Sequence, residues 1–309
     1  MRYVEVGGLR LSVIGLGTWQ FGSYEWGYGT TYASDTAPAL VRRAIELGVT
    51  LIDTAEMYGF GRSERIVGQA IAGRRDAVVL ATKLVPLLPL PTVVNWQVRG
   101  SLRRLGVEAI DLYQVHFPNP LVSPRSTVAP LRTLLEQGLV HHVGVSNHSL
   151  GRWRASERGL GHPILTNQVR FSLAAPLPRW ELVPYACEEE RVVIAYSPLG
   201  QGLLSGGHTR RSPAPADIRR RSSLFRPRSL RLAEPLLAAL REVAAAHAAT
   251  TAQVALAWLI GHGNVVAIPG ARTLAQLEEN VAAADLELSG TEQDRLTAEA
   301  VRFESAARR

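Results

Sequence analysis

The stretch LIDTAEMYGFGRSE, residues 51–64, joins a short apolar segment to a helical one through a loop rich in glycine and polar residues. Its apolar start ends at Asp53 and predicts a strand over residues 50–53. Ser63, followed directly by an acidic residue, suits the start of a helix over residues 63–72. The stretch therefore predicts one strand–loop–helix unit with polar side chains just after the strand.

The same alternation runs along the chain. Further strands are predicted at residues 13–16, 78–83, 110–115, 142–146, 164–169, 192–196 and 265–268. Helices are predicted at residues 36–47, 93–105, 128–137, 150–158, 182–189 and 273–283, and an extra pair at 230–247 and 251–260 interrupts the last unit. Eight such strands predict an α/β fold of the (β/α)8 TIM-barrel type, with a short N-terminal β-hairpin at residues 3–6 and 9–12 and extra C-terminal helices.

An open, doubly wound sheet is the competing architecture, and it carries a G-x-G-x-x-G fingerprint after its first strand. This chain has Gly15 and Gly17 but Gln20 at the third position. A phosphate-binding G-x-x-x-x-G-K-[ST] loop is also absent, because Thr82 precedes Lys83. The sequence therefore favours the barrel.

The 309 residues are 46% hydrophobic and 20% charged, which suits one barrel domain over residues 1–309 with a large core. The single cysteine, Cys187, excludes an internal disulfide framework and a cysteine-built metal site, and we expect no metal. The chain shows no signal-peptide pattern at its start and no run near the roughly 18 apolar residues of a membrane span. We expect a cytoplasmic protein with no membrane partner.

Most of the net charge of +7 lies in one segment, residues 205–230, where seven arginines accompany a single acidic residue, Asp217. These arginines are Arg210, Arg211, Arg219, Arg220, Arg221, Arg226 and Arg228. Because the cluster is confined to one segment, it suits binding of a small anion better than binding of a nucleic-acid duplex. Binding of single-stranded RNA by residues 210–228 is the alternative, but Phe225 is the only aromatic residue there for base stacking. We expect no nucleic-acid partner.

Lys83 is the only lysine among 34 basic residues, and it ends a predicted strand. Arginine is a wide, permanently charged fork, whereas lysine is a compact charge whose pKa moves on burial. The composition therefore predicts a position at which only an ammonium group works, and the alternative is an accidental surface lysine.

Three successive strand ends carry Asp53, Lys83 and His116, and Tyr58 lies on the loop after the first of them. In a TIM barrel the carboxyl ends of the strands face the active site. Each residue on its own also has a purely structural explanation. Asp53 is explained as a helix cap, Tyr58 as a core residue, and His116 as a hydrogen-bonded, half-buried histidine. Together they predict an active site.

Seven motifs carry a resemblance that spans nearly the whole chain in order: LIDTAEMYGFGRSE, VVLATK, IDLYQVH, VGVSN, LTNQVRFS, IAYSPLGQGLLSG and IPGARTLAQLEEN. The chain resembles the aldo-keto reductases. The last motif, with Gly270 and Arg272, is similar to the bacterial and potassium-channel β-subunit branch. The resemblance implies NADPH-dependent reduction of an aldehyde or ketone to an alcohol. A cofactor must supply the hydride, because no side chain is a hydride donor.

The resemblance makes Tyr58 the proton donor, Lys83 and Asp53 the pair that tunes it, and His116 the group that orients the substrate carbonyl. A free tyrosine has a pKa near 10, and an adjacent ammonium group stabilises its phenolate. We therefore expect Lys83 to lower the pKa of Tyr58. Asp53 would keep Lys83 charged and in place, and His116 would donate to the carbonyl oxygen as its charge develops.

The cofactor residues are also implied by the resemblance. They are Thr18, Trp19, Ser146, Asn147, Gln168, Tyr196, Ser197, Pro198, Leu199, Gln201, Gly202, Gly270, Arg272, Gln276, Glu279 and Asn280. Ser146, Asn147 and Gln168 would hold the nicotinamide carboxamide, and Tyr196 would stack on its ring. Residues 197–204 would wrap the pyrophosphate. Arg272 would pair with the 2′-phosphate that NADPH has and NADH lacks, which favours NADPH.

Aromatic residues of the predicted loops suit the walls of a substrate pocket. They are Trp19, Tyr24, Trp26 and Phe117, and the apolar loop 84–91 joins them. Such walls imply a small-molecule carbonyl with an apolar body. The alternative function is an NADP(H)-binding sensor or accessory subunit with little turnover, as the resemblance to channel β subunits suggests. The full set of Asp53, Tyr58, Lys83 and His116 favours an active enzyme.

Overall fold

The computed structural model describes residues 1–28, 36–206 and 217–308. Eight parallel strands form one sheet in the order β3 to β10. They are β3 (Leu16–Gly17), β4 (Leu51–Asp53), β5 (Val79–Leu84), β6 (Ile110–Val115), β7 (Val140–Ser146), β8 (Ile164–Arg170), β9 (Val192–Tyr196) and β10 (Val265–Ala267). All eight predicted strands are present, although the first is shorter than expected and begins later.

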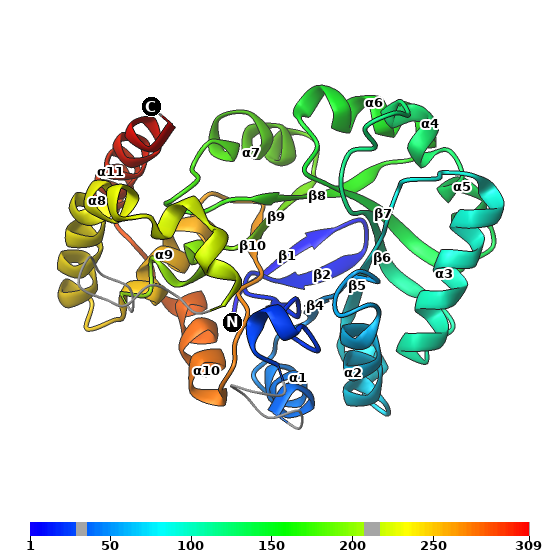
Figure 1. The fold of residues 1–309 in the computed structure, drawn as a ribbon, viewed down its shortest axis with the longest axis horizontal. Helices are drawn as coiled ribbons and strands as arrows, with labels where there is room; N and C mark the ends of the chain where they lie inside the picture. The colour runs from blue at the N-terminus through cyan, green and yellow to red at the C-terminus, as the bar shows by residue number, and fades with distance from the viewer. Residues whose placement is uncertain (29–35, 207–216, 309) are drawn as a thin grey trace.

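Hydrogen bonds between the first and last strands close the sheet. Gly15 N donates to Ala267 O at 2.8 Å, Ala267 N donates to Val13 O at 2.9 Å, and Gly17 N donates to Pro269 O at 3.1 Å. A parallel bridge between Ile14 and Ala267 lies beside them. The predicted (β/α)8 barrel is therefore confirmed, with its helices arranged around the strands (Figure 1).

The helices are α1 (Thr36–Glu46), α2 (Arg62–Ile71), α3 (Pro91–Leu105), α4 (Pro124–Val128), α5 (Leu131–Glu136), α6 (Leu150–Leu160), α7 (Pro178–Glu188), α8 (Pro227–Ala246), α9 (Thr251–Ile260), α10 (Leu274–Ala282) and α11 (Gly290–Arg308). The single helix predicted over residues 128–137 is instead α4 and α5, separated at Ala129 and Pro130. Proline has no N–H to continue a helical ladder, which accounts for the break.

Both helices of the predicted extra pair are present, as α8 and α9, but only α8 is additional to the barrel. Helix α9 packs on β10, as a barrel helix does, and eight of its side chains are buried. Helix α8 packs against α11, a C-terminal helix that the sequence did not predict, and the two lie together at one side of the barrel (Figure 1).

The N-terminal hairpin has the predicted bounds, β1 (Tyr3–Val6) and β2 (Leu9–Ser12), and covers one end of the barrel. Its apolar side chains share a cluster with residues that point into the barrel, such as Leu112 and Leu165. Gly7, with φ +55°, lies so close that a Cβ there would be 2.5 Å from Leu165 Cδ1. The hairpin therefore seals this end, and the open end is the one to which the strands point.

Within the described ranges, no single helix is long and apolar enough to cross a membrane. Helices α8 and α9 reach that threshold only as a pair, across a bend of 94°.

Candidate active site

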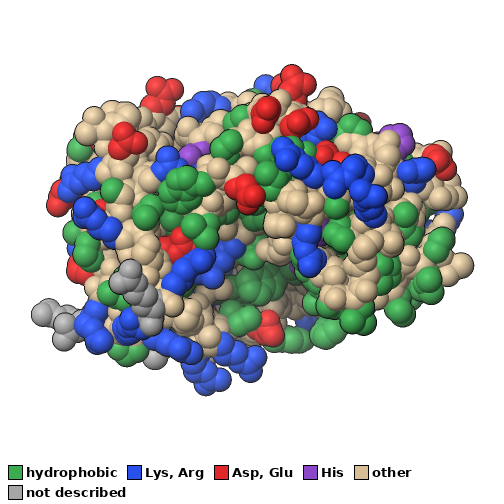
Figure 2. All heavy atoms as spheres, turned by 90° about the horizontal axis from the view of Figure 1, so that it is seen from above, with side chains coloured by type: hydrophobic (Ala, Val, Ile, Leu, Met, Phe, Trp, Pro, Cys, Tyr) green, Lys and Arg blue, Asp and Glu red, His purple; other side chains and the backbone are tan. Residues whose placement is uncertain are grey.

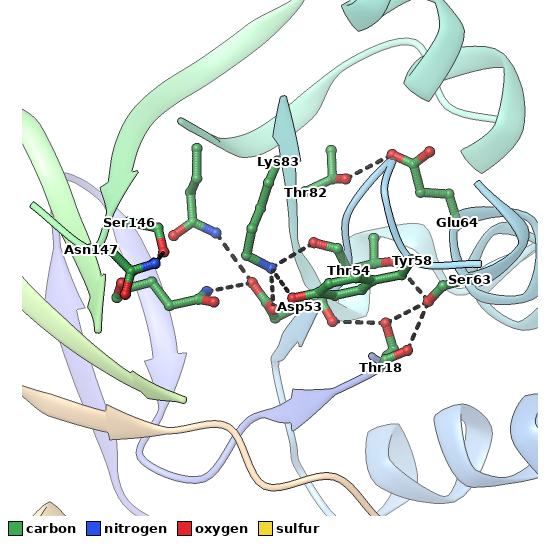
Figure 3. Close-up of polar contacts among 12 residues, drawn as sticks. Thr18, Asp53, Thr54, Tyr58, Ser63, Glu64, Thr82, Lys83, Ser146 and Asn147 are labelled. Atoms are coloured by element: carbon green, nitrogen blue, oxygen red, sulfur yellow. Dashed lines mark hydrogen bonds and ion pairs between the residues drawn. The ribbon is translucent and has the colours of Figure 1, made fainter. Parts of the chain in front are cut away.

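A buried lysine joins three groups at the open end of the barrel. Lys83, at the end of β5, has no exposed side-chain surface. Its Nζ donates to Asp53 Oδ1 at 2.5 Å, to the main-chain oxygen of Thr54 at 2.8 Å and to Tyr58 Oη at 3.2 Å. Figure 3 shows the ammonium group between Asp53 and Tyr58. Hydrogen bonds thus join the predicted catalytic residues Asp53, Tyr58 and Lys83 directly, and the lysine does not lie on the surface.

The second carboxylate oxygen of Asp53 accepts two further hydrogen bonds. Gln168 Nε2 donates at 2.7 Å and Gln114 Nε2 at 3.1 Å. The resemblance implies that Gln168 holds a nicotinamide carboxamide, and in this structure its amide nitrogen holds Asp53. Gln114, from β6, was not among the predicted site residues. Asp53 is therefore fixed by Lys83 on one oxygen and by two amides on the other.

Hydroxyl groups behind this network fix the backbone that carries it. Thr18 Oγ1 donates to the main-chain oxygen of Asp53 at 2.8 Å and lies 2.8 Å from Ser63 Oγ. Thr54 Oγ1 donates to Ser63 Oγ at 2.9 Å, and Ser63 Oγ donates to Thr18 O at 3.0 Å (Figure 3). All three hydroxyl residues are fully buried. Thr18, predicted as a cofactor residue, thus uses its hydroxyl group to anchor the strand end.

Burial and charge set the protonation of Tyr58 and Lys83. Burial lowers the pKa of Lys83, but the Asp53 carboxylate and the Tyr58 phenol outweigh it, so the pKa lies above the ordinary value of 10.5. Burial raises the pKa of Tyr58 above 10, and the Asp53 charge adds to this, while Lys83 acts in the opposite direction. Lys83 therefore lowers the pKa of Tyr58 as expected, but burial and Asp53 outweigh it, and the net shift is upward. Tyr58 is protonated at neutral pH, as a proton donor must be.

His116 packs edge-on against the ring of Tyr58, with 5.7 Å between ring centroids. Burial, and next the charge of Lys83, lower its pKa to about 3. Its Nδ1 is buried, and no hydrogen-bond partner for it exists in the part of the chain that the structure describes. At neutral pH the imidazole is therefore uncharged and carries one N–H that it can donate.

Asp53, Tyr58 and His116 border a cavity of about 1360 Å³ at the open end of the barrel. Figure 2 shows one face of the molecule with a hollow that contains hydrophobic side chains and has basic side chains at its edges. Every predicted cofactor residue lines the cavity, as do Trp19, Tyr24 and Trp26. Phe117 does not line it and instead packs beside His116, with 5.9 Å between ring centroids. Loop 84–91 contributes Val85 alone, so the predicted apolar wall is smaller than expected.

Hydrogen bonds order the wall formed by the ends of β7, β8 and β9. Ser146 Oγ donates to Gln168 O at 2.8 Å, and Asn147 Nδ2 donates to Ser146 Oγ at 3.1 Å. Tyr196 Oη donates to Asn147 Oδ1 at 3.0 Å. Asn147 (φ 58°) and Ser197 (φ 50°) both adopt left-handed backbone conformations, which are uncommon for residues other than glycine and concentrate at functional sites.

At the far end of the cavity, two arginines share one carboxylate. Arg272 Nη2 lies 3.1 Å from Asp217 Oδ2, and Arg219 Nε lies 2.7 Å from Asp217 Oδ1. Burial raises the pKa of Asp217, but the hydrogen bonds from Arg219 and Arg272 outweigh this and lower it to about 2. Arg219 thus joins the cavity from the basic segment, as the sequence led us to expect of some of its arginines. Arg210 and Arg211 lie outside the described residues.

Sequence reasoning missed the wall formed by the loop after β4 and by helix α3. This wall includes Met57, Phe60, Arg62, Trp96, Gln97, Gly100, Arg103 and Arg104. Exposed Trp96, at 71% accessible, was the one available signal, because a large aromatic residue on a solvated helix face often marks a binding surface.

The comparisons with known proteins agree with this geometry. The sequence model of the Aldo/keto reductase family matches residues 13–299. The chain belongs to the aldo/keto reductase family. An uncharacterized oxidoreductase of Mycobacterium tuberculosis is 53% identical over 96% of this chain and 92% of its own length. A methylglyoxal reductase of Escherichia coli is 34% identical over 93% of this chain and 90% of its own.

A solved aldo/keto reductase structure from Klebsiella pneumoniae, in complex with NADP and acetate, is 32% identical to this chain. It superposes with a TM-score of 0.77 over 96% of this chain and 94% of its own. The sequence resemblance to the aldo-keto reductases is thereby confirmed.

Proposed function

We propose that this aldo/keto reductase reduces an aldehyde or ketone to an alcohol with NADPH as the hydride donor. The observation that carries the proposal is the buried Lys83 ammonium group, which bonds Asp53 and the Tyr58 phenol together at the edge of the cavity. This arrangement holds a protonated phenol beside a cation that will stabilise the phenolate once the proton has left. It supports proton transfer to an oxygen atom, and it contains no activated nucleophile.

Each side chain has a separate task in this proposal. When bound, the nicotinamide cofactor supplies the hydride that reaches the carbonyl carbon. Tyr58 donates its proton to the carbonyl oxygen, and the charge of Lys83, 3.2 Å from Tyr58 Oη, stabilises the phenolate that remains. Neutral His116 donates a hydrogen bond to the same carbonyl oxygen, at the point where negative charge develops. Asp53 holds Lys83 in place.

The lining of the cavity fits a phosphorylated dinucleotide. Trp26 Nε1 and Gln201 Oε1 are buried cavity-lining atoms without a hydrogen-bond partner among the described residues, and buried polar groups normally have one. Arg272 presents a guanidinium group suited to a 2′-phosphate, and its nearest carboxylate is shared with Arg219. Ser146, Asn147 and Tyr196 form the wall at the Tyr58 end, where the nicotinamide would lie. The Klebsiella relative was solved with NADP, which supports this assignment.

Fluorescence titration with NADPH and NADH, followed by a screen of aldehydes, ketones, diketones and quinones, tests the proposal. We expect tighter binding of NADPH than of NADH, and NADPH oxidation that depends on a carbonyl compound. Tight NADPH binding without oxidation by any carbonyl in the panel would contradict the proposal and favour the sensor or accessory-subunit alternative.

A further inference from the structure

The cavity does not end at Tyr58. It continues between the loop that follows β4 and helix α3, a part that we call the side channel and define by Arg62, Trp96, Gly100, Arg103 and Arg104. A second cavity of about 360 Å³ adjoins it and is lined by Arg65, Gly100, Arg103 and Arg104. One hollow therefore connects the catalytic phenol with a group of arginines.

Two of these arginines are committed to the protein. Arg104 Nε donates to Glu64 Oε2 at 2.5 Å, and the buried Glu64 accepts a second bond from Thr82 at 2.7 Å. Arg62 Nη1 donates to Gly22 O at 2.9 Å, and its guanidinium group lies 4.7 Å from the ring centre of Tyr24. These contacts fix two guanidinium groups at the wall but leave some of their N–H donors unassigned.

The other two arginines are not neutralised. Arg65 and Arg103 are exposed, and neither forms an ion pair with a described residue. A second acidic side chain, Glu56, lies with its Oε2 4.0 Å from Arg104 Nη2, and its Oε1 accepts from Val85 N at 2.6 Å and from Gln97 Nε2 at 3.0 Å. Guanidinium groups without acidic partners attract anions, and they bind carboxylate and phosphate oxygens in pairs.

We propose that the side channel binds the anionic end, a carboxylate or phosphate, of an elongated substrate whose carbonyl group reaches Tyr58. The inference rests on the proposed function and adds a substrate class to it. Between the two ends, Met57 and Trp96 offer apolar surface, 51% and 71% exposed, to the body of the substrate. Arg103 is the residue that sets this specificity, because it lines both cavities and has no competing acidic partner among the described residues.

Matched substrates test the proposal in the wild-type enzyme. Straight-chain ω-carboxyaldehydes of increasing length are compared with their methyl esters at saturating NADPH, because each ester keeps the length and removes the charge. We expect kcat/KM for the acid to exceed that for its ester by about fivefold at the best length, the usual reach of a solvent-exposed ion pair. The preference is expected to disappear at 1 M salt, where charges are screened beyond about 3 Å. A phosphate-terminated aldehyde distinguishes the two anion types.

Variants then locate the effect. Arg103→Gln is expected to remove the preference for acids, because it lowers kcat/KM for each acid more than for the matching ester. Arg99→Gln, on the same helix but outside both cavities, is the matched control and is expected to keep the preference. Equal turnover of acids and esters by the wild type, or an equal loss for both in Arg103→Gln, would overturn the inference while the proposed function stood. Failure of every carbonyl, esters included, would overturn both.

Discussion

The two ends of the cavity are built differently. At the catalytic end, Lys83 and Asp53 are buried and hydrogen-bonded on every side, and their positions are fixed by strands β4 and β5. At the far end, Arg272, Asp217 and Arg219 keep 29%, 16% and 18% of their side-chain surface exposed. Water can replace a lost partner at the far end but not at the catalytic end. We therefore expect substitutions to have severe effects at the catalytic end and smaller, graded effects at the far end.

Lys83→Arg is the strongest test of the catalytic end of the cavity. The substitution keeps the charge, but the planar guanidinium group is too large for a fully enclosed position between Asp53 and Tyr58. We expect turnover to fall at least ~100-fold, the usual contribution of a positioned acid–base group, while NADPH affinity changes much less. Steady-state kinetics and cofactor titration measure the two quantities.

Arg75→Lys is the matched control for the size of the cation, since Arg75 pairs with Asp111 at 2.7 Å outside the cavity and keeps 27% of its side chain exposed. We expect near-normal turnover from it. Near-normal activity of Lys83→Arg itself across pH 6–9 would show that the single lysine is an accident of composition.

Arg272→Gln tests the far end of the cavity. Removing the guanidinium group is expected to raise the Kd for NADPH about tenfold, because a hydrogen bond to a charged group contributes about 1.5 kcal/mol or more. The Kd for NADH, which lacks the 2′-phosphate, is expected to change less than twofold. Arg10→Gln, on the hairpin at the sealed end, serves as the control. Equal losses for both cofactors would refute the assignment of Arg272 to the 2′-phosphate.

Asp217→Asn is expected to have a smaller effect with the opposite sign. The carboxylate competes with a 2′-phosphate for Arg272, so its neutralisation is expected to tighten NADPH binding about twofold to fivefold, within the range of an exposed ion pair. NADH binding is expected to stay unchanged. Weaker NADPH binding would show instead that Asp217 positions Arg272 for the cofactor.

The rate of the chemical step is expected to be almost independent of pH between pH 5.5 and 9. His116 has its pKa lowered to about 3, so it stays neutral throughout this range. Burial raises the pKa of Tyr58 above its ordinary value, so Tyr58 keeps its proton, and activity is lost only as the pH rises through this raised pKa. Single-turnover reduction measures this step directly. A step near pH 6.5 would show that His116 titrates normally and that the site is more open to water.

The same contrast explains what the sequence predicts and what it does not. Asp53 and Lys83 lie at the ends of their strands and His116 directly follows one, and barrel geometry brings strand ends together whatever their side chains are. The bond from Gln168 to Asp53 depends on a rotamer chosen by its neighbours, so no sequence pattern reveals it.

Two further features, the place of Arg103 in the cavity wall and helix α11, were not predicted from the sequence, for physical reasons. On a helix that is solvated along one side, Arg103 looks like any other surface arginine, and only the adjacent loop makes it part of a wall. Helix α11 buries only Leu296, Ala300 and Phe303 among many charged residues, so its apolar stripe is narrow. The spacing of these three residues, four and then three, is the helical signal that was present.

The most direct measurement of the central claim is single-turnover carbonyl reduction by Tyr58→Phe, with NADPH binding measured on the same sample. The substitution removes one hydroxyl group that contacts Lys83 and leaves the ring against His116. We expect the rate to fall at least ~100-fold while the Kd for NADPH changes less than about twofold, because only the proton donor is lost. A variant that binds NADPH normally and keeps more than about a tenth of the wild-type rate would contradict the assignment of Tyr58 as the proton donor.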